Sequence, residues 1–145
     1  LTKFLLPHFI KRKSGHFVNV SSLTGKFGTP YRSGYAASKH ALHGFFDAVR
    51  AEHYADNIKV TMICPGFIHT PITYAALTGD GSALNKMDEA QYKGKPAAWC
   101  AHKIIRAIES KKEEVYIGGK EVWGAYIKRF FPSMFSRIIR KIPVR

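Results

Sequence analysis

Three short segments rich in β-branched residues alternate with long helical patterns, and this alternation limits the chain to one class of fold. The β-type segments are 16–20, 58–64 and 114–117, and helical patterns cover 35–54 and the stretch from Pro96 to about Ser110. Alternation of this kind is typical of βαβ units, in which parallel strands form one sheet. The sequence therefore predicts an α/β fold of three layers, with helices on both faces of a parallel sheet.

Apolar spacing predicts which faces of the helices are buried. The stripes are Leu42, Phe45, Phe46 and Val49 in the first pattern, Ala101, Ile104, Ile105 and Ile108 in the second, and Leu1, Phe4, Leu5 and Phe9 at the start of the chain. The last of these predicts that the chain opens inside a helix, which closes at Gly15. Between 67 and 95 periodicity is weak, so we expect a long irregular segment with a short helix.

The length suggests one domain, but the strand inventory is small. A chain of 145 residues can bury a core of its own. Three parallel strands nevertheless make a small sheet. A parallel strand needs neighbours on both sides, so this set of strands is incomplete for the predicted fold. We divide the chain into a sheet-bearing part, 1–119, and a tail, 120–145.

The tail carries much of the positive charge. The formal net charge is +13, and between Lys120 and Arg145 seven Lys or Arg are opposed only by Glu121. Its apolar positions (Val122, Trp123, Tyr126, Ile127, Phe130, Phe131, then Phe135, Ile138, Ile139 and Ile142 after Pro132) keep helical spacing. Two interpretations stay open: an amphipathic membrane-surface segment, or a helix packed on the core.

Composition excludes several other classes. No apolar run reaches the roughly 18 residues of a membrane-spanning helix. Zinc-finger spacing and RNA-binding aromatic segments are absent, so nucleic acid is not an expected partner. Cys64 and Cys100 fit no metal or redox spacing, which favours a reduced compartment and a cytoplasmic protein, peripheral to a membrane if the tail contacts lipid.

One pair of residues suggests acid–base chemistry. Tyr35 and Lys39 are four residues apart on a predicted helix and so share one face. A tyrosine titrates near pH 10, and a nearby cation favours the phenolate. Tyr116 and Lys120 have the same spacing, but that match runs from a strand into a Gly-Gly turn and is attributed to chance.

Other polar groups are predicted to lie near Tyr35 and Lys39. Ser22 follows the first strand, and Pro65-Gly66 breaks the second, with Thr70 close behind. Ligands bind at the carboxyl ends of strands in open α/β sheets. The histidines near these motifs (His40, His43, His53 and His69) form no metal-ligand spacing and are assigned surface or packing roles, His69 alone being a candidate for substrate contact. Cys64 is expected to be a buried strand residue.

Taken together, the motifs Val18-Asn-Val-Ser-Ser22, Tyr35-Ala-Ala-Ser-Lys39 and Pro65-Gly-Phe-Ile-His-Thr70 resemble the short-chain dehydrogenase/reductase family. Within it, the similarity is greatest to the subgroup of dehydrogenase/reductase member 7B. The resemblance implies a Rossmann-type fold, a small carbonyl or alcohol substrate, a homo-oligomeric parent, and NADP(H) or NAD(H) as cofactor, with NADP(H) favoured.

The resemblance also implies roles for residues. Tyr35 would be the acid–base, Lys39 would assist it and bind the nicotinamide ribose, and Ser22 would hold the substrate oxygen. Pro65, Gly66, Ile68 and Thr70 would line the nicotinamide, and 71–95 would form a lid over the substrate. No metal is implied.

One family motif is missing. The glycine-rich turn that cradles the pyrophosphate has no match, since Thr24-Gly25 lacks the later glycines and Gly79-Asp-Gly81 is followed by Leu84. The chain therefore resembles the second half of such an enzyme, with the last three strands, and we expect it to be inactive alone. The alternative is a truncated remnant that serves as an interaction or membrane-surface module.

Overall fold

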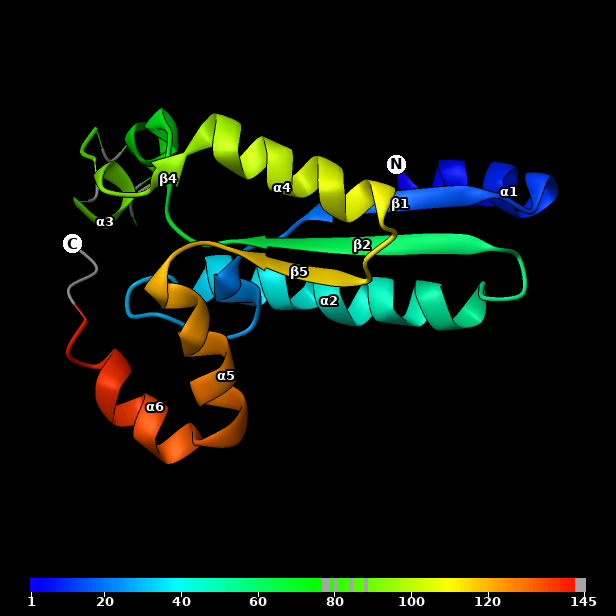
Figure 1. The fold of residues 1–145 in the computed structure, drawn as a ribbon. Helices are drawn as coiled ribbons and strands as arrows, with labels where there is room; N and C mark the ends of the chain where they lie inside the picture. The colour runs from blue at the N-terminus through cyan, green and yellow to red at the C-terminus, as the bar shows by residue number, and fades with distance from the viewer. Residues whose placement is uncertain (77–78, 80, 84, 88, 143–145) are drawn as a thin grey trace.

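The computed structural model describes residues 1–76, 79, 81–83, 85–87 and 89–142, and in them a parallel sheet lies between helices (Figure 1). The sheet contains β1 (Gly15–Val20), β2 (Ile58–Pro65) and β5 (Glu114–Ile117) in the order β1-β2-β5. Gly15 lies opposite Ile58 and Met62 opposite Glu114, and both pairs are parallel. The predicted α/β fold and its strands are confirmed.

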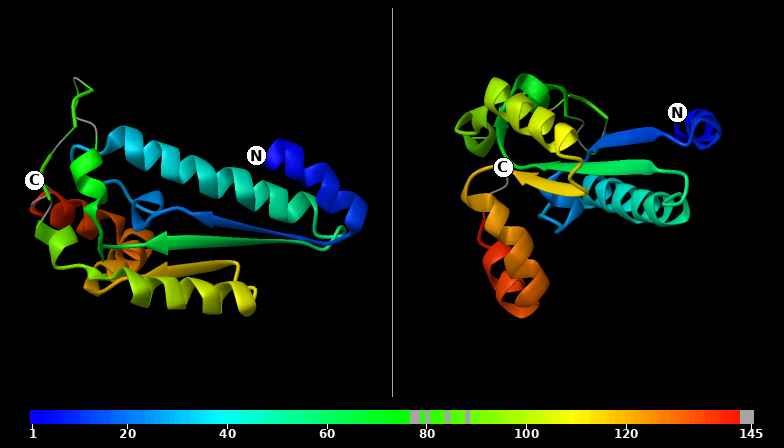
Figure 2. Two further views of the ribbon diagram at one scale, coloured as in Figure 1. Left: turned by 90° about the horizontal axis from the view of Figure 1, so that it is seen from above. Right: turned by 45° about the vertical axis from the view of Figure 1, so that its right-hand side comes forward.

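Helices cover both faces of this sheet. Helix α2 (Ser33–Glu52) lies on one face and α4 (Ala97–Glu109) on the other, while α1 (Thr2–Arg12) runs beside β1 (Figure 2). The central strand β2 is buried over nearly its whole length because it has a neighbour on each edge and a helix on each face. This three-layer arrangement places every strand's carboxyl end at one edge.

The core is divided by the alternation of side chains along β2. Val60 and Met62 pack with Phe46 of α2, whereas Ile63 packs with Cys100 and Ala107 of α4. Successive side chains of a strand point to opposite faces, so one strand supplies both halves of the core.

Several residues predicted to be buried are exposed. Phe45 is 53% exposed, because adjacent residues on a helix point in different directions and Phe46 faces the sheet. Ile105 and Phe4 are exposed as well, and α1 contacts the core only through Leu6, Phe9 and Ile10. The predicted stripes were wider than the faces that the sheet can cover.

The first helix also ends differently from the prediction. Lys13, with φ of 49°, adopts the left-handed conformation that closes α1, and its N–H bonds to Ile10. Gly15 instead begins β1, where a Cβ atom would overlap the ring of Phe9. The glycine is required by this close approach and not by the helix end.

The segment between β2 and α4 contains more regular structure than expected. Two-residue strands β3 (Ile68–His69) and β4 (Lys95–Pro96) pair in parallel, and the 3₁₀-helix η2 (Pro71–Ala75) and the short α3 (Glu89–Tyr92) lie between them. Leu84, which the glycine-motif comparison uses, lies outside the described residues.

The end of the chain folds into a helical hairpin. After η3 (Lys120–Val122), α5 (Trp123–Phe130) and α6 (Pro132–Ile139) turn back on each other below the sheet (Figure 1). Phe135 packs on Phe27, with ring centroids 5.1 Å apart. Arg145 lies outside the described residues, and no helix among the described ones has the length and apolarity needed to cross a bilayer.

Candidate active site

Ser22 lies just past β1, at the edge where the strands end. Its backbone is extended, and its hydroxyl accepts a hydrogen bond from the N–H of Thr24 (3.1 Å), capping the 3₁₀-helix η1 (Leu23–Gly25). The same hydroxyl donates to the carbonyl of Pro65 at 3.5 Å. Ser22 thus caps η1 and also connects the end of β1 to the Pro65-Gly66 turn.

Tyr35 and Lys39 lie in the first two turns of α2, on the same face as predicted. The ammonium of Lys39 donates to the carbonyl of Val20 at 3.1 Å and lies 5.6 Å from the ring centroid of Tyr35. The Tyr35 side chain is 47% exposed. Because an ammonium carries three donors, Lys39 retains hydrogen-bonding capacity toward the open edge. It connects Tyr35 to the strand that leads into Ser22.

The second Tyr-x-x-x-Lys match has a different environment. Tyr116 lies in β5 and Lys120 in η3. Burial raises the pKa of the Tyr116 phenol above its ordinary value, and a hydrogen bond to Glu114 raises it further. A phenol held protonated in this way is unsuited to acid–base exchange near neutral pH.

The Pro65-Gly66 turn is fixed by a residue that sequence reasoning missed. Glu121 accepts hydrogen bonds through Oε1 from the N–H of Phe67 (3.1 Å) and of Gly119 (2.9 Å). A Cβ atom on Gly66 would collide with the same side chain, so a larger residue there would displace Glu121. The only signal for Glu121 is its position as the sole acid in a basic tail, directly after a Gly-Gly turn.

A second missed residue contacts the other end of this segment. The side-chain amide of Gln91, on α3, donates to the carbonyl of Ile68 and to the Thr70 hydroxyl, the latter at 3.3 Å. His69 donates to the carbonyl of Tyr92 at 2.6 Å. The predicted nicotinamide-lining residues therefore contact the predicted lid, while a substrate contact for His69 stays a prediction.

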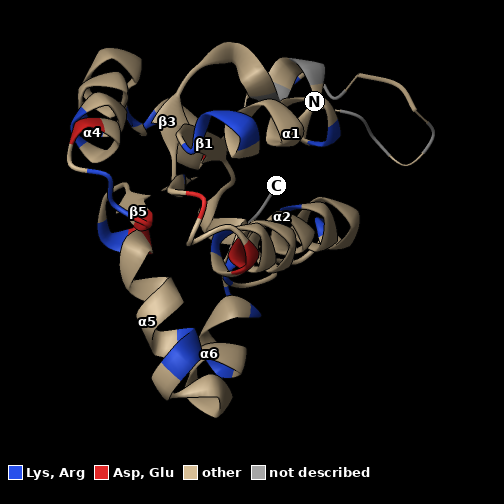
Figure 3. Cartoon of the chain, turned by 90° about the vertical axis from the view of Figure 1, so that its right-hand side faces the viewer, with Lys and Arg blue, Asp and Glu red and all other residues tan. Residues whose placement is uncertain are grey.

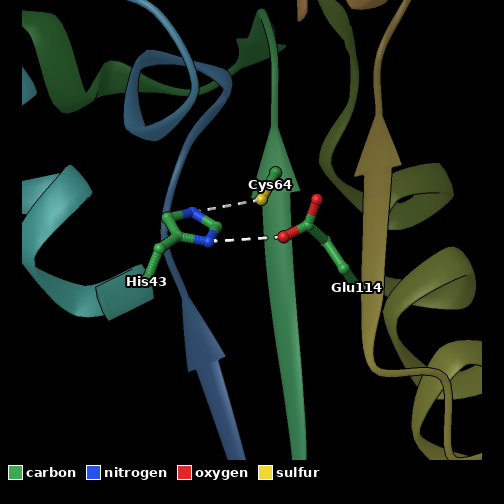
Figure 4. Close-up of side chains that lie close together, drawn as sticks. All are labelled: His43, Cys64 and Glu114. Carbon is green, nitrogen blue, oxygen red and sulfur yellow. Dashed lines mark hydrogen bonds and ion pairs between the residues drawn. The ribbon is translucent and has the colours of Figure 1, made fainter. Parts of the chain in front are cut away.

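A buried polar cluster lies behind the site (Figure 4). Nδ1 of His43 is 3.3 Å from Oε2 of Glu114, and its Nε2 is 3.6 Å from Sγ of Cys64. Lys26 also lies 2.6 Å from the same Oε2. The cluster joins the loop after β1, helix α2, β2 and β5.

The charges in this cluster are fixed by their surroundings. Burial raises the pKa of the Glu114 carboxyl, but contacts with His43, Lys26 and Tyr116 outweigh it and lower the pKa to about 2. Burial, with Glu114 nearby, raises the pKa of the Cys64 thiol to about 12. The carboxylate is therefore ionised and the thiol protonated at neutral pH.

These donor atoms lie within 4.8 Å of one another, as metal ligands would. Two features argue for a structural role instead. His43 presents one ring nitrogen to the sulfur and the other to the carboxylate, so a single ion cannot use both. The ammonium of Lys26 already neutralises the carboxylate. Cys64 is the fully buried strand residue that the sequence predicts.

Comparison with known proteins agrees with this geometry. The family model described as short chain dehydrogenase matches residues 1–80, more than half of the 145 residues. The chain belongs to the short-chain dehydrogenase family. Among curated members of the family, it is 44% identical over 140 residues to dehydrogenase/reductase SDR family member 7B of Mus musculus, and 40% identical over 146 residues to dehydrogenase/reductase SDR family protein 7-like of Drosophila melanogaster.

These alignments use nearly all of this chain but less than half of the relatives. They cover 96% of it and 43% of the mouse protein, and 100% of it and 45% of the fly protein. The family and subgroup resemblance read from the motifs is confirmed.

Two solved structures have the same fold as this chain. A short chain dehydrogenase from Burkholderia cenocepacia J2315 in complex with NADP superposes with a TM-score of 0.74 at 18% identity, over 98% of this chain and 53% of that one. A family member from Burkholderia phymatum in complex with NAD gives 0.74 at 17% identity, over 92% and 53%. The Rossmann-type architecture is confirmed.

Proposed function

We propose that this chain carries the catalytic half of an oxidoreductase that interconverts a carbonyl and an alcohol with NADP(H) or NAD(H). The observation that carries the proposal is the placement of Lys39, which is bonded to the end of β1 and lies 5.6 Å from the ring centroid of Tyr35. A cation and an exposed phenol then share the strand edge with Ser22, where ligands bind in open α/β sheets.

Each of the three residues has a role in moving one proton. During reduction, the hydroxyl of Tyr35 donates its proton to the substrate oxygen, and during oxidation it takes the proton back. The ammonium of Lys39 stabilises the phenolate that remains, because opposite charges attract at short range. Ser22 exchanges its long 3.5 Å bond to Pro65 for a bond to the substrate oxygen.

The residues at the edge fit the nicotinamide end of the cofactor. When bound, the nicotinamide exchanges the hydride with the substrate carbon. Lys39 would keep donors for the ribose hydroxyls, the backbone of Pro65 and Gly66 would line the ring, and Ile68 and Thr70 would continue that wall. The neighbours crystallised with NADP and with NAD support a nicotinamide cofactor, and we favour NADP(H) from the family resemblance.

The pyrophosphate end needs residues that this sequence lacks. The family's pyrophosphate-binding glycine motif has no match in this sequence, and the chain covers 43% of the length of its mouse relative. We propose that a preceding half supplies that turn, that residues 71–95 form the substrate lid, and that the present chain has no turnover alone.

The test is Tyr35→Phe in a form of the protein that includes the glycine-rich half. Turnover of a carbonyl substrate should fall about 10²- to 10⁴-fold, the usual contribution of a general acid. The dissociation constant for NADPH should be unchanged. Tyr54→Phe, which alters an exposed tyrosine just beyond α2, is the matched control. Equal turnover in the Tyr35→Phe variant and the unaltered protein contradicts the proposal.

The competing function is a non-enzymatic remnant, favoured by the missing glycine-rich turn. Fluorescence titration of this chain with NADPH separates the two. Saturable binding at micromolar concentration contradicts the remnant, because such a module has no reason to retain a cofactor site. Turnover by the longer form contradicts it as well.

A further inference from the structure

The hairpin α5–α6 has two apolar faces, although the sequence predicted one stripe. The inner face packs Ala125 and Phe135 against Leu23, Phe27 and the buried Cys64. Four of the ten residues of the predicted stripe belong to this inner contact: Val122, Ile127, Phe135 and Ile139. The core therefore accounts for only one side of the hairpin.

The outer face exposes large aromatic rings. Trp123 is 66% exposed, Phe130 68% and Phe131 61%. Tyr126, Met134 and Ile138 of the same two helices are also exposed, as is Ile142 just beyond α6. Contiguous exposed apolar surface of this kind marks a contact with a partner or a membrane, whereas single exposed residues do not.

Cations, and no acids, lie among these rings. The hairpin carries Lys128, Arg129, Arg137, Arg140 and Lys141, all exposed, and residues 122–142 include no Asp or Glu. The view in Figure 3 shows basic positions and no acidic ones on α5 and α6. The charge of this face complements an anionic surface.

The shape of the hairpin favours a partner with a flat surface over a partner that binds in a groove. The two helices project from the body on the side opposite α1 and α4 (Figures 1 and 3). Each has eight residues, or about 12 Å of helix, so neither approaches the roughly 30 Å of a bilayer core. A short amphipathic element with aromatic rings and cations on its outer face is suited to the interface of a membrane.

We propose that the outer face of the α5–α6 hairpin docks on the surface of an anionic bilayer. Trp123, Phe130 and Phe131 enter the interfacial region, and the five cations lie against lipid phosphates and carboxylates. The aliphatic stems of Lys and Arg can lie along the apolar surface while their charges reach the headgroups. Neither Tyr35 nor Ser22 is among the residues of the proposed contact, and the proposal is independent of the oxidoreductase proposal.

Co-sedimentation of this chain with vesicles tests the proposal. It should pellet with vesicles of phosphatidylcholine and phosphatidylserine, much less with phosphatidylcholine alone, and less at high salt, which screens charge. Trp123→Ser with Phe130→Ser and Phe131→Ser should lower the partition coefficient at least tenfold. Phe4→Ser with Phe45→Ser and Tyr54→Ser, three exposed rings elsewhere, should leave it unchanged.

A second pair of variants distinguishes docking through the hairpin from a general attraction between the basic chain and anionic vesicles. Lys128→Gln with Arg129→Gln should lower the partition coefficient about fivefold for each removed cation. Lys3→Gln with Lys11→Gln removes the same charge from α1 and should have little effect. Equal losses in the two pairs, or binding to an acidic polypeptide without binding to vesicles, overturn the proposal.

A spectroscopic readout does not depend on how the triple variant folds. Trp99→Phe leaves Trp123 as the sole tryptophan, since the chain has two. Its emission should shift to shorter wavelength when phosphatidylserine vesicles are added, because the ring leaves water. Unchanged emission with saturating vesicles overturns the proposal.

Discussion

The two ends of the sheet carry similar polar residues but use them differently. At the amino end, Asp56 accepts hydrogen bonds from Lys13 and from His53, so side chains pair with one another beside a turn. At the carboxyl end, Lys39 and Glu121 bond to backbone groups.

The difference supports the carboxyl end as the site that we propose for the ligand. Side chains that pair with one another have little capacity left, and the amino end is a closed turn. Side chains that hold backbone in place fix the loops around an open edge, where the Tyr35 side chain is 47% exposed. The partners of these polar groups, more than their number, distinguish the proposed site from the amino end.

The largest expected difference is in turnover, between substitutions of two lysines that lie near opposite ends of β1. Lys39→Met, in the form with the glycine-rich half, should lower turnover about 10²-fold or more, because the cation beside Tyr35 is lost. Lys13→Met should leave turnover within about twofold, since an exposed ion pair contributes little. Steady-state kinetics measure the turnover of both variants. Equal losses of turnover would contradict the proposed difference between the two ends of the sheet.

The next contrast concerns Glu114, the half-buried carboxylate behind the carboxyl end. Glu114→Gln leaves Lys26 and His43 without their anion and should lower the free energy of unfolding by about 2 kcal/mol at pH 7. Because the folded-state pKa of Glu114 is lowered from 4.5 to about 2, its contribution is complete above pH 4.5 and is lost as the pH falls toward 2.

Urea unfolding of both proteins across this range measures the effect. The difference in unfolding free energy should shrink between pH 4.5 and 2. A difference that stays constant with pH would show that the carboxylate charge is not the source of the stability. Asp56→Asn, at the exposed amino end, should show no comparable loss at pH 7.

Local patterns predicted the strands and the proximity of Tyr35 and Lys39 well, for a physical reason. Strand and helix patterns depend on residues that are neighbours in sequence. Tyr35 and Lys39 are likewise four residues apart on one helix, so their proximity follows from the helix alone. The predicted helix 35–54 is observed as Ser33–Glu52 with a shift of two residues.

The residues that sequence reasoning missed act over long separations. Glu121 contacts Phe67, 54 positions away, and Glu114 meets His43 from a different element. Neither contact leaves a periodic signal. The exposed Phe45 was misjudged because apolar spacing does not say how wide a face its neighbours can cover.

The smallest contrast compares two carboxylates, Glu121 and Asp56. Glu121→Ala leaves the N–H groups of Phe67 and Gly119 without their acceptor, which should cost about 1–2 kcal/mol of unfolding free energy and loosen the Pro65-Gly66 turn. In the longer form we expect KM for the cofactor to rise several-fold, with kcat changed less. Asp56→Ala removes a half-buried carboxylate at the other end of the sheet, whose partners are side chains, so KM should not change. A KM that responds equally to both substitutions would mean that the turn is positioned by general stability and not by the Glu121 contacts.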